Sequence, residues 1–402
     1  MSKLPVMLIS GFLGSGKTTL LQYLLTQPHG KKIALIVNDM ASVNIDTQVV
    51  QAYESKEHIV EMTNGCICCT LREDLFEQIE EIAESKKYDY LIIESTGIAE
   101  PLPVAQTLTF ENEDGISLSE IASLDAMITM VDAAHFLELF DKEETLQEIG
   151  MGADEHDERS LSGLIAEQVE FANIIIVNKT DQINNHQLLL LTQFIQAINP
   201  QAKIYSTTYG KIDLDLVFNT HLYKKEDFDQ LEIWKETIQK QEKSEADTYG
   251  ITSFVYQART PFHPERFWNF IHESWDGVLR VKGYFWLATR PEMAGFLVQA
   301  GKVREHQFSG FWWANMDRKE WPIDDPSFQK ILERHQAYPS FDKRQELVFI
   351  GMNLDENYFR EKLDSCLLRK EEISQIGVIN DPFPVWADIL DISDDEPEYE
   401  LL

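Results

Sequence analysis

A glycine-rich segment near the start of the chain has the residue types and the spacing of a phosphate-binding loop. The pattern G-x-x-x-x-G-K-T lies between an apolar run and a helical apolar pattern. Glycines let successive backbone N–H groups face one concavity and approach phosphate oxygens, and the helix directs its positive end to the same place. The residues expected to bind the phosphates are Gly11, Gly14, Ser15, Gly16, Lys17, Thr18 and Thr19. Lys17 would act on the outer phosphates during hydrolysis, and the Thr18 hydroxyl would bind Mg²⁺.

A second motif indicates which base the nucleotide carries. Asn178, Lys179 and Asp181 form an N-K-x-D pattern directly after the apolar run Ile174–Val177. The Asp181 carboxylate would accept hydrogen bonds from the ring N–H and the exocyclic amine of guanine. Adenine lacks this donor pair and would leave the carboxylate unpaired, which is a strong form of selectivity. The motif therefore predicts GTP and GDP as ligands.

An acidic residue at the end of a buried strand is expected on the metal side of the phosphates. Glu94 follows the apolar residues 91–93, and Gly97 comes three residues later. Because Glu94 is one methylene longer than the usual Asp, we expect it to reach Mg²⁺ through a water. The Gly97 N–H is placed to meet the γ-phosphate and to sense its loss.

The loop after the second predicted strand supplies further candidates for hydrolysis. Asp39 and Asp46 lie in this loop and are candidates for contacting Mg²⁺ or positioning the attacking water. The alternative for each is a solvated residue that caps a helix, and the sequence does not decide which one positions water.

Three cysteines within four positions indicate metal chemistry. Cys66, Cys68 and Cys69 can supply three soft ligands to one ion, with the fourth position left to water or to a partner. Thiolates favour Zn²⁺ or Cu(I), and Co²⁺ and Ni²⁺ are also possible. A redox pair and buried inert thiols are the alternatives. Cys366 stands alone in a helical pattern and is interpreted as a packing residue.

The elements that position these residues alternate between apolar strands and helices, which predicts an α/β domain with a mainly parallel sheet and flanking helices. The predicted strands are Leu4–Ile9, Lys32–Val37, Ile59–Met62, Tyr90–Ile93, Ala126–Val131 and Ile174–Val177. The predicted helices are Thr19–Thr26, Glu73–Ser85, Ser160–Glu170 and His186–Ile198.

The composition changes along the chain and predicts four parts. The nucleotide-binding domain spans residues 1–220, and a charged connector spans 221–249. An aromatic-rich, smaller α+β domain spans 250–370, and an acidic tail spans 371–402. In the consecutive aromatics Phe311, Trp312 and Trp313, alternation along a strand predicts that one ring is exposed.

Charge and hydropathy exclude several kinds of partner. The chain of 402 residues has a net charge of −33, which disfavours nucleic acid and anionic membrane surfaces. We expect neither a signal peptide nor a transmembrane helix. Clustered thiols without a disulfide pattern are typical of a reducing, cytoplasmic protein. The sequence does not decide between a monomer and a homodimer.

Taken together, the motifs resemble those of the CobW-type metallochaperone GTPases. The resemblance covers most of the chain and is carried by the segments 11–18, 65–69, 94–101 and 178–181. It implies GTP hydrolysis with Mg²⁺, metal binding by the three cysteines, a CobW C-terminal domain, and delivery of zinc, in some members cobalt, to a client metalloprotein. The branch it most resembles is associated with zinc limitation.

Two departures from the family pattern affect this interpretation. Many relatives have Asn-Glu-Phe-Gly where this chain has Asn38-Asp39-Met40-Ala41, so a metal contact from Asp39 would use a shorter side chain. The ten histidines are scattered, which argues against metal storage. Two alternative functions stay open: a zinc sensor or storage protein with a passive nucleotide, and a redox-regulated GTPase. The sequence does not identify the client or the physiological metal.

Overall fold

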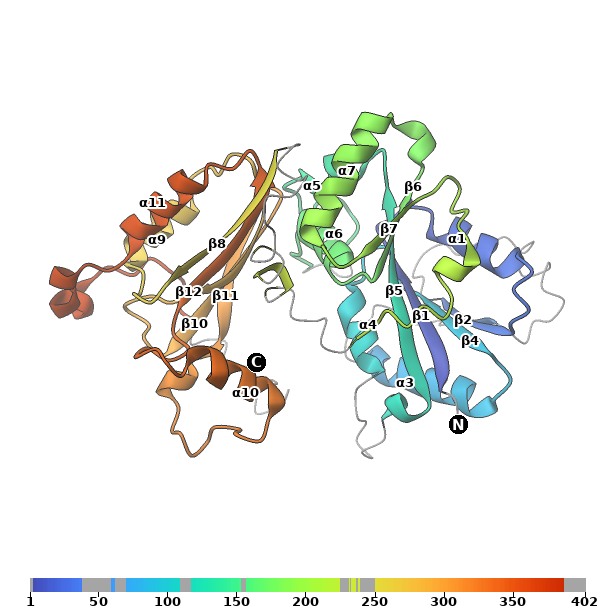
Figure 1. Ribbon diagram of the computed structural model, residues 1–402, viewed down its shortest axis with the longest axis horizontal. Helices are drawn as coiled ribbons and strands as arrows, with labels where there is room; N and C mark the ends of the chain where they lie inside the picture. Colours follow the sequence, from blue (N-terminus) through green and yellow to red (C-terminus); the bar gives the residue numbers. More distant parts are fainter. Residues whose placement is uncertain are drawn as a thin grey trace. The chain divides into compact units, whose positions relative to one another are not determined.

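The computed structural model describes residues 3–37, 59–61, 70–108, 117–152, 157–224, 231, 233–235, 238 and 250–386. The chain divides into two compact units, Met1–Ile233 and Trp234–Leu402, coloured from blue to yellow-green and from yellow to red (Figure 1). Among the described helices, none has the length and apolarity needed to cross a bilayer.

The first unit is built on a seven-stranded sheet in which every neighbouring pair runs parallel. The strand order is β3-β2-β4-β1-β5-β6-β7. The central strands are continuous apolar runs because both faces are covered. The strands are β1 (Leu4–Ser10), β2 (Ile33–Val37), β3 (Ile59–Glu61), β4 (Tyr90–Glu94), β5 (Ala122–Asp132), β6 (Ile174–Asn178) and β7 (Lys203–Ser206).

Helices cover both faces of this sheet. Leu20 and Leu24 of α1 pack on one face, and Phe76 and Ile79 of α3 pack on the other. The helices are α1 (Lys17–Thr26), α3 (Thr70–Ser85), α4 (Pro101–Thr107), α5 (Phe136–Phe140), α6 (Leu161–Glu170) and α7 (Asn185–Ile198). Because all strands are parallel, their carboxyl ends gather the connecting loops at one edge.

β5 begins four residues before its predicted start because a polar residue interrupts its apolar pattern. The pairing with β1 shifts at Asp125, which forms a buried bulge. Its carboxylate accepts hydrogen bonds from the Tyr90 hydroxyl and the backbone N–H groups of Thr220 and His221. The bulge therefore ties the segment after β7 to the centre of the sheet.

The second unit contains a five-stranded antiparallel sheet with the order β11-β10-β9-β12-β8. The strands are β8 (Ile251–Ala258), β9 (Val278–Phe285), β10 (Met293–Ala300), β11 (Val303–Phe311) and β12 (Gln345–Met352). The helices are α9 (Pro264–Ile271), α10 (Pro326–His335) and α11 (Glu356–Cys366). The fold class predicted from the sequence, a mainly parallel α/β domain followed by a smaller α+β domain, is confirmed.

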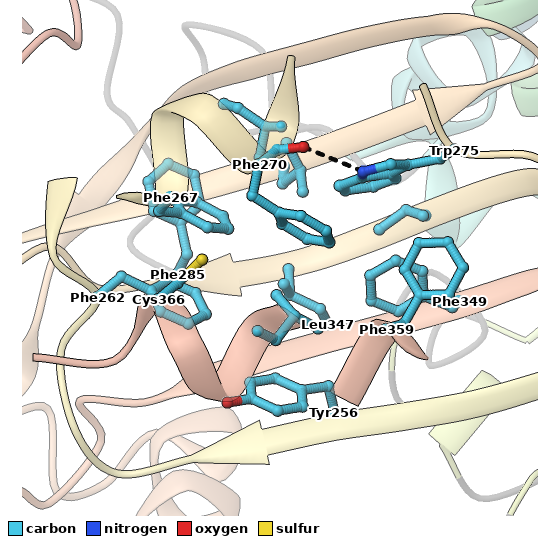
Figure 2. Close-up of a cluster of buried hydrophobic side chains, with 14 of the residues drawn as sticks. Tyr256, Phe262, Phe267, Phe270, Trp275, Phe285, Leu347, Phe349, Phe359 and Cys366 are labelled. Carbon is cyan, nitrogen blue, oxygen red and sulfur yellow. Dashed lines mark hydrogen bonds between the residues drawn. The ribbon is translucent and has the colours of Figure 1, made fainter. Parts of the chain in front are cut away.

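Aromatic side chains fill the core between this sheet and the helices α9 and α11 (Figure 2). Phe254 and Phe349 stack with ring centroids 4.8 Å apart, and the Trp275 indole N–H donates to the Phe270 carbonyl over 3.1 Å. Cys366 is buried in the same core, as predicted. β11 ends at Phe311, which is 36% exposed, and the two following tryptophans are buried.

A short segment beyond α11, Asp381–Trp386, packs against this core, and we call it the clip. Phe383 and Trp386 are buried, so packed chain continues past residue 370, where the composition placed the end of the domain. The Arg290 guanidinium donates to both Asp381 carboxylate oxygens and to the carbonyls of Phe383 and Pro384. It also lies 4.4 Å from the Trp386 ring centroid. Arg290 therefore contacts four residues of the clip, and the Thr289 hydroxyl adds a hydrogen bond to Asp381 over 2.6 Å.

We predict that Arg290→Ala lowers the stability of the second unit by about 2–3 kcal/mol, because it removes the charged partner of a partly buried carboxylate and the donor of two carbonyls. All eight tryptophans lie between Trp234 and Trp386, so tryptophan fluorescence during urea unfolding reports this unit. Lys330→Ala, at an exposed position of α10, is the control. An unchanged midpoint for Arg290→Ala would show that the contacts of Arg290 with the clip do not stabilise this unit.

Candidate functional site

The phosphate loop connects β1 to α1 and has the backbone conformation that a phosphate cradle needs. Gly11, Gly14 and Gly16 have φ values of 131°, 76° and 107°, in the region that favours glycine. The Ser15 N–H donates to the Phe12 carbonyl, which closes the turn. α1 then begins at Lys17, so its N-terminal N–H groups face the loop.

Two of these glycines are also required by close packing. A Cβ on Gly11 would lie 2.3 Å from the Met130 carbonyl oxygen, and one on Gly16 would lie 2.4 Å from Asn178 Nδ2. A Cβ on Gly14 would meet no atom of the described chain within 4 Å. Gly11 and Gly16 are therefore required both by their positive φ and by the lack of room for a Cβ, and Gly14 is required by its φ alone.

The side chains of the loop suit a polyanionic ligand. Lys17 is buried, and its Nζ donates to the Gly11 carbonyl over 2.7 Å, which places the ammonium over the loop. Thr18 and Thr19 are exposed on the first turn of α1. Among the described residues the buried Ser15 hydroxyl has no hydrogen-bond partner, and a ligand oxygen or a water would satisfy it.

Asn178, the first residue of the predicted guanine motif, joins the phosphate loop to the loop that follows β7. Its side chain is 2% exposed, and its Nδ2 donates to the Ser15 carbonyl over 3.0 Å. Its Oδ1 accepts from the Thr207 hydroxyl and from the Gly210 N–H. The first residue of the predicted guanine motif is therefore a buried strut between two loops.

The loop 207–210 is a part of the site that sequence reasoning missed. It follows β7, and its Thr207 carbonyl accepts from both the N–H and the hydroxyl of Thr180. A Cβ on Gly210 would lie 3.0 Å from the Leu20 backbone, so the loop also lies against α1. Tyr209, 68% exposed, has a φ of 56°, which is unusual outside glycine. Gly210 also has a positive φ, 63°, and the contacts that place the loop come from residues distant in the sequence, so no local pattern predicted it.

Lys179 and Asp181 extend from the same turn. The Lys179 ammonium donates to Asp132 over 2.7 Å, and His135 contacts the same carboxylate oxygen. Burial raises the pKa of Asp132, but the hydrogen bonds from Lys179, His135 and the Ala134 N–H outweigh it and lower the pKa overall. Asp181 is exposed, so its carboxylate is accessible to a base.

The candidate metal-side residues follow β4, next to the phosphate loop. Glu94 pairs in register with Ile9 of β1 and with Val37 of β2, and it is 7% exposed. A Cβ on Gly97 would lie 2.6 Å from the Leu13 side chain and 2.8 Å from the Leu13 N. The structure therefore brings the turn at Gly97 into direct contact with the phosphate loop.

The remaining candidates lie outside the described residues; they are Asp39, Asp46, Cys66, Cys68 and Cys69. The described neighbours of the cysteine segment are the end of β3 at Glu61 and the start of α3 at Thr70. Within the described ranges, His, Cys, Asp and Glu side chains form no cluster of three that would hold a metal ion.

Two family models match this chain. The model of the CobW/HypB/UreG nucleotide-binding domain matches residues 5–206. The model of the cobalamin synthesis protein cobW C-terminal domain matches residues 251–367. The Asp381–Trp386 clip lies beyond the second match.

Several named proteins are similar over most of the chain. The zinc-regulated GTPase metalloprotein activator 1 of Dictyostelium discoideum is 40% identical over 412 residues, which cover 98% of this chain and 86% of that protein. The zinc chaperone YjiA of Escherichia coli is 32% identical over 301 residues, which cover 72% of this chain and 84% of that protein. A crystal structure of Zn(II)-bound YjiA GTPase is 24% identical and covers 92% of this chain and 100% of that one. Its TM-score of 0.41 is too low to carry a structural argument.

Substitutions at Gly11 and Gly14 distinguish the effect of close packing from the effect of backbone conformation. We predict that Gly11→Ala raises the Kd of a fluorescent guanine nucleotide about a hundredfold or more, since its Cβ collides with the backbone of β5. Gly14→Ala, which adds strain of about 1–2 kcal/mol in open space, should raise it about tenfold. Equal effects of both variants would contradict the packing seen at Met130.

Proposed function

This chain belongs to the CobW/HypB/UreG family of nucleotide-binding proteins, and on that basis we propose that it is a GTP-hydrolysing metallochaperone. It binds zinc, or a similar transition metal such as Co²⁺, through Cys66, Cys68 and Cys69. It delivers the ion to client metalloproteins under zinc limitation. The names of its relatives, a zinc-regulated GTPase activator and a zinc chaperone, support this function.

The single observation that carries the nucleotide half of the proposal is the strut made by Asn178. It connects the phosphate loop to the Gly210 loop, and Asp181 follows three residues after it. A phosphate cradle tied by a buried amide to a turn that carries an exposed carboxylate suits a guanine nucleotide rather than an isolated phosphate.

The metal-side residues fit the Mg²⁺ that accompanies such a nucleotide. The Thr18 hydroxyl is exposed at the start of α1, and Glu94 ends the strand next to β1. These two oxygen donors suit a hard cation, and the bound ion would neutralise charge on the phosphate oxygens. Lys17 stabilises the charge that develops on the outer phosphates, and Asp39 or Asp46 positions the attacking water.

The cysteines supply the metal half. The cysteine segment follows β3, and the phosphate loop follows β1. Because these strands are parallel, both segments begin at the edge of the sheet formed by the carboxyl ends of the strands. β3 and β1 are three strand positions apart, about 14 Å at the usual spacing. Three thiolates with one open position suit an ion that is handed on rather than one held permanently.

The coupling between the two halves runs through the loops that follow β2 and β4. In the sheet order these strands lie between β3 and β1. Asp39 and Asp46 follow β2 and Gly97 follows β4, so the loops expected to contact the γ-phosphate leave strands that lie between the strand of the cysteine segment and the strand of the phosphate loop. GTP would order these loops and shape the thiolate site, and hydrolysis would release the ion.

The proposal places the protein in the cytoplasm, as a monomer or homodimer whose partners are GTP, GDP, the metal ion and a client metalloprotein. It excludes nucleic acid and membranes as partners, in accord with the net charge of −33.

We predict that the Zn²⁺ affinity differs at least tenfold between the GTP and GDP states, which corresponds to about 1.4 kcal/mol of coupling. Competition titration with a chromophoric chelator measures it, with Co²⁺ as a second ion. Changing Cys66, Cys68 and Cys69 to Ser should abolish the high-affinity site. Cys366→Ala, in the core of the second unit, is the matched control and should leave the Zn²⁺ affinity in both states unchanged.

Two results of that titration and of a GTP-turnover assay would contradict the proposal. Equal Zn²⁺ affinities in both states, together with negligible GTP turnover, would favour a zinc-binding protein with a passive nucleotide. A turnover that responds to thiol oxidation and not to chelation would favour a redox-regulated GTPase.

Asp181→Asn tests the choice of base. The change replaces an acceptor of two guanine donors by an amide, and we predict that the GDP affinity falls about a hundredfold. Xanthosine diphosphate, which carries a carbonyl in place of the exocyclic amine, should bind the variant better than the wild type. Asp215→Asn, at an exposed position, is the control. An unchanged GDP affinity would mean that Asp181 does not contact the base.

A further inference from the structure

The turn that carries Gly97 is held by a side chain from a distant helix. Gln168 lies on α6 and is 1% exposed. Its Nε2 donates to the carbonyls of Gly97 and Ala99, each over 3.1 Å. The Ala99 N–H donates to the Thr96 carbonyl, so the hydrogen bonds define a four-residue turn with Gly97 second. A single buried amide group therefore binds two of the carbonyls of this turn.

A chain of buried hydrogen bonds connects Gln168 to the start of the phosphate loop. The Gln168 carbonyl accepts from the Thr129 hydroxyl over 2.5 Å, and that hydroxyl lies 2.8 Å from the Ser10 hydroxyl. Ser10 is the last residue of β1 and precedes Gly11. The turn at Gly97 is thus fixed relative to the phosphate loop through side chains as well as through the sheet.

The other end of the turn is held by charge. The Arg159 guanidinium donates to the Glu100 carboxylate over 2.9 Å and to both oxygens of Asp157 over 2.8 Å. Glu100 directly follows the turn and is the N-cap residue of α4. The arginine side chain is about one-third exposed, so this contact is weaker than the buried one that Gln168 makes.

The geometry of the turn decides where its N–H groups point. The C=O and N–H of one trans peptide point in opposite directions. Because the Thr96 carbonyl faces the Ala99 N–H, the Gly97 N–H points out of the turn. In the described chain no acceptor takes that N–H, and Gly97 packs against Leu13 of the phosphate loop.

We propose that Gln168 is the positioning residue that holds the Gly97 N–H ready for the γ-phosphate, and so sets the preference for a nucleoside triphosphate over a diphosphate. The inference rests on the proposed function, because it requires a guanine nucleotide in the phosphate loop. Gln168 itself touches no phosphate. It orders the turn before the nucleotide binds, and only a nucleotide with a γ-phosphate gains from that preorganisation.

Gln168→Met keeps the length and volume of the side chain and removes its donor. We expect the Kd of the non-hydrolysable analogue guanosine 5′-(β,γ-imido)triphosphate to rise about tenfold and the Kd of GDP to change less than twofold. Gln196→Met is the matched control. Gln196 also donates to two backbone carbonyls, those of Asn199 and Pro200, but lies at the end of α7. This control should leave both affinities unchanged.

Gln168→Glu adds a readout that a purely structural role would not give. The ionised carboxylate has no proton to donate and faces two carbonyl oxygens, so the preference for the triphosphate analogue should be lost at pH 8. Burial and the two carbonyls raise the pKa of the introduced carboxyl. As the pH falls towards 5.5 the protonated acid regains one donor, and the preference relative to wild type at the same pH should return.

The outcomes separate this inference from the proposed function. Hydrogen exchange at the Ala99 amide, measured without nucleotide, should be at least tenfold faster in Gln168→Met than in wild type. Unchanged exchange, or an equal loss of affinity for both nucleotides, would overturn the role of Gln168 even if the wild type hydrolyses GTP. If exchange accelerates but the wild type binds no guanine nucleotide, then the turn is held as described, the proposed function fails, and the triphosphate role falls with it.

Discussion

The nucleotide site depends on one buried amide group, the side chain of Asn178. It donates to the Ser15 carbonyl, 163 residues away in the chain, and accepts from Thr207 and Gly210. A buried amide is costly unless it is fully hydrogen-bonded, so these partners must keep their positions. Gly16 is required beside it because any Cβ would collide with the amide nitrogen. The phosphate loop, the base-reading turn and the loop after β7 are therefore one unit.

The parallel sheet makes this unit useful. It brings the ends of β1, β4 and β6 to one edge, so residues from three distant segments of the chain lie together there. Gly97 packs on the phosphate loop with its carbonyl held by Gln168. In the proposed function the γ-phosphate binds at this contact, and its presence or loss changes how the cysteine segment after β3 binds the metal ion.

Local sequence patterns predicted most of the strands and helices of the first unit. They predicted few of the long-range hydrogen bonds that hold its candidate nucleotide site. Apolar segments predicted six of the seven strands, and several of them are continuous runs because burial on both faces leaves a clear signal. The short, half-exposed strand β7 and its loop left none. Asp125 hid the start of β5, because its partners come from residues 90 and 220–221. Gln168 looks like any helical glutamine, since its two acceptors lie 71 and 69 residues earlier. The roles of Asp39, Asp46 and the three neighbouring cysteines stay predictions.

The central claim is that the nucleotide and the metal ion change each other's binding, and thermodynamic linkage gives it a direct test. The measurement is the Kd of the non-hydrolysable GTP analogue and of GDP, each with and without saturating Zn²⁺. Reciprocity requires Zn²⁺ to change the ratio of these two Kd values by the same factor by which the two nucleotides change the Zn²⁺ affinity, at least tenfold. A ratio that Zn²⁺ leaves unchanged would contradict the account, because the phosphate loop and the thiolates would then be independent sites on one chain.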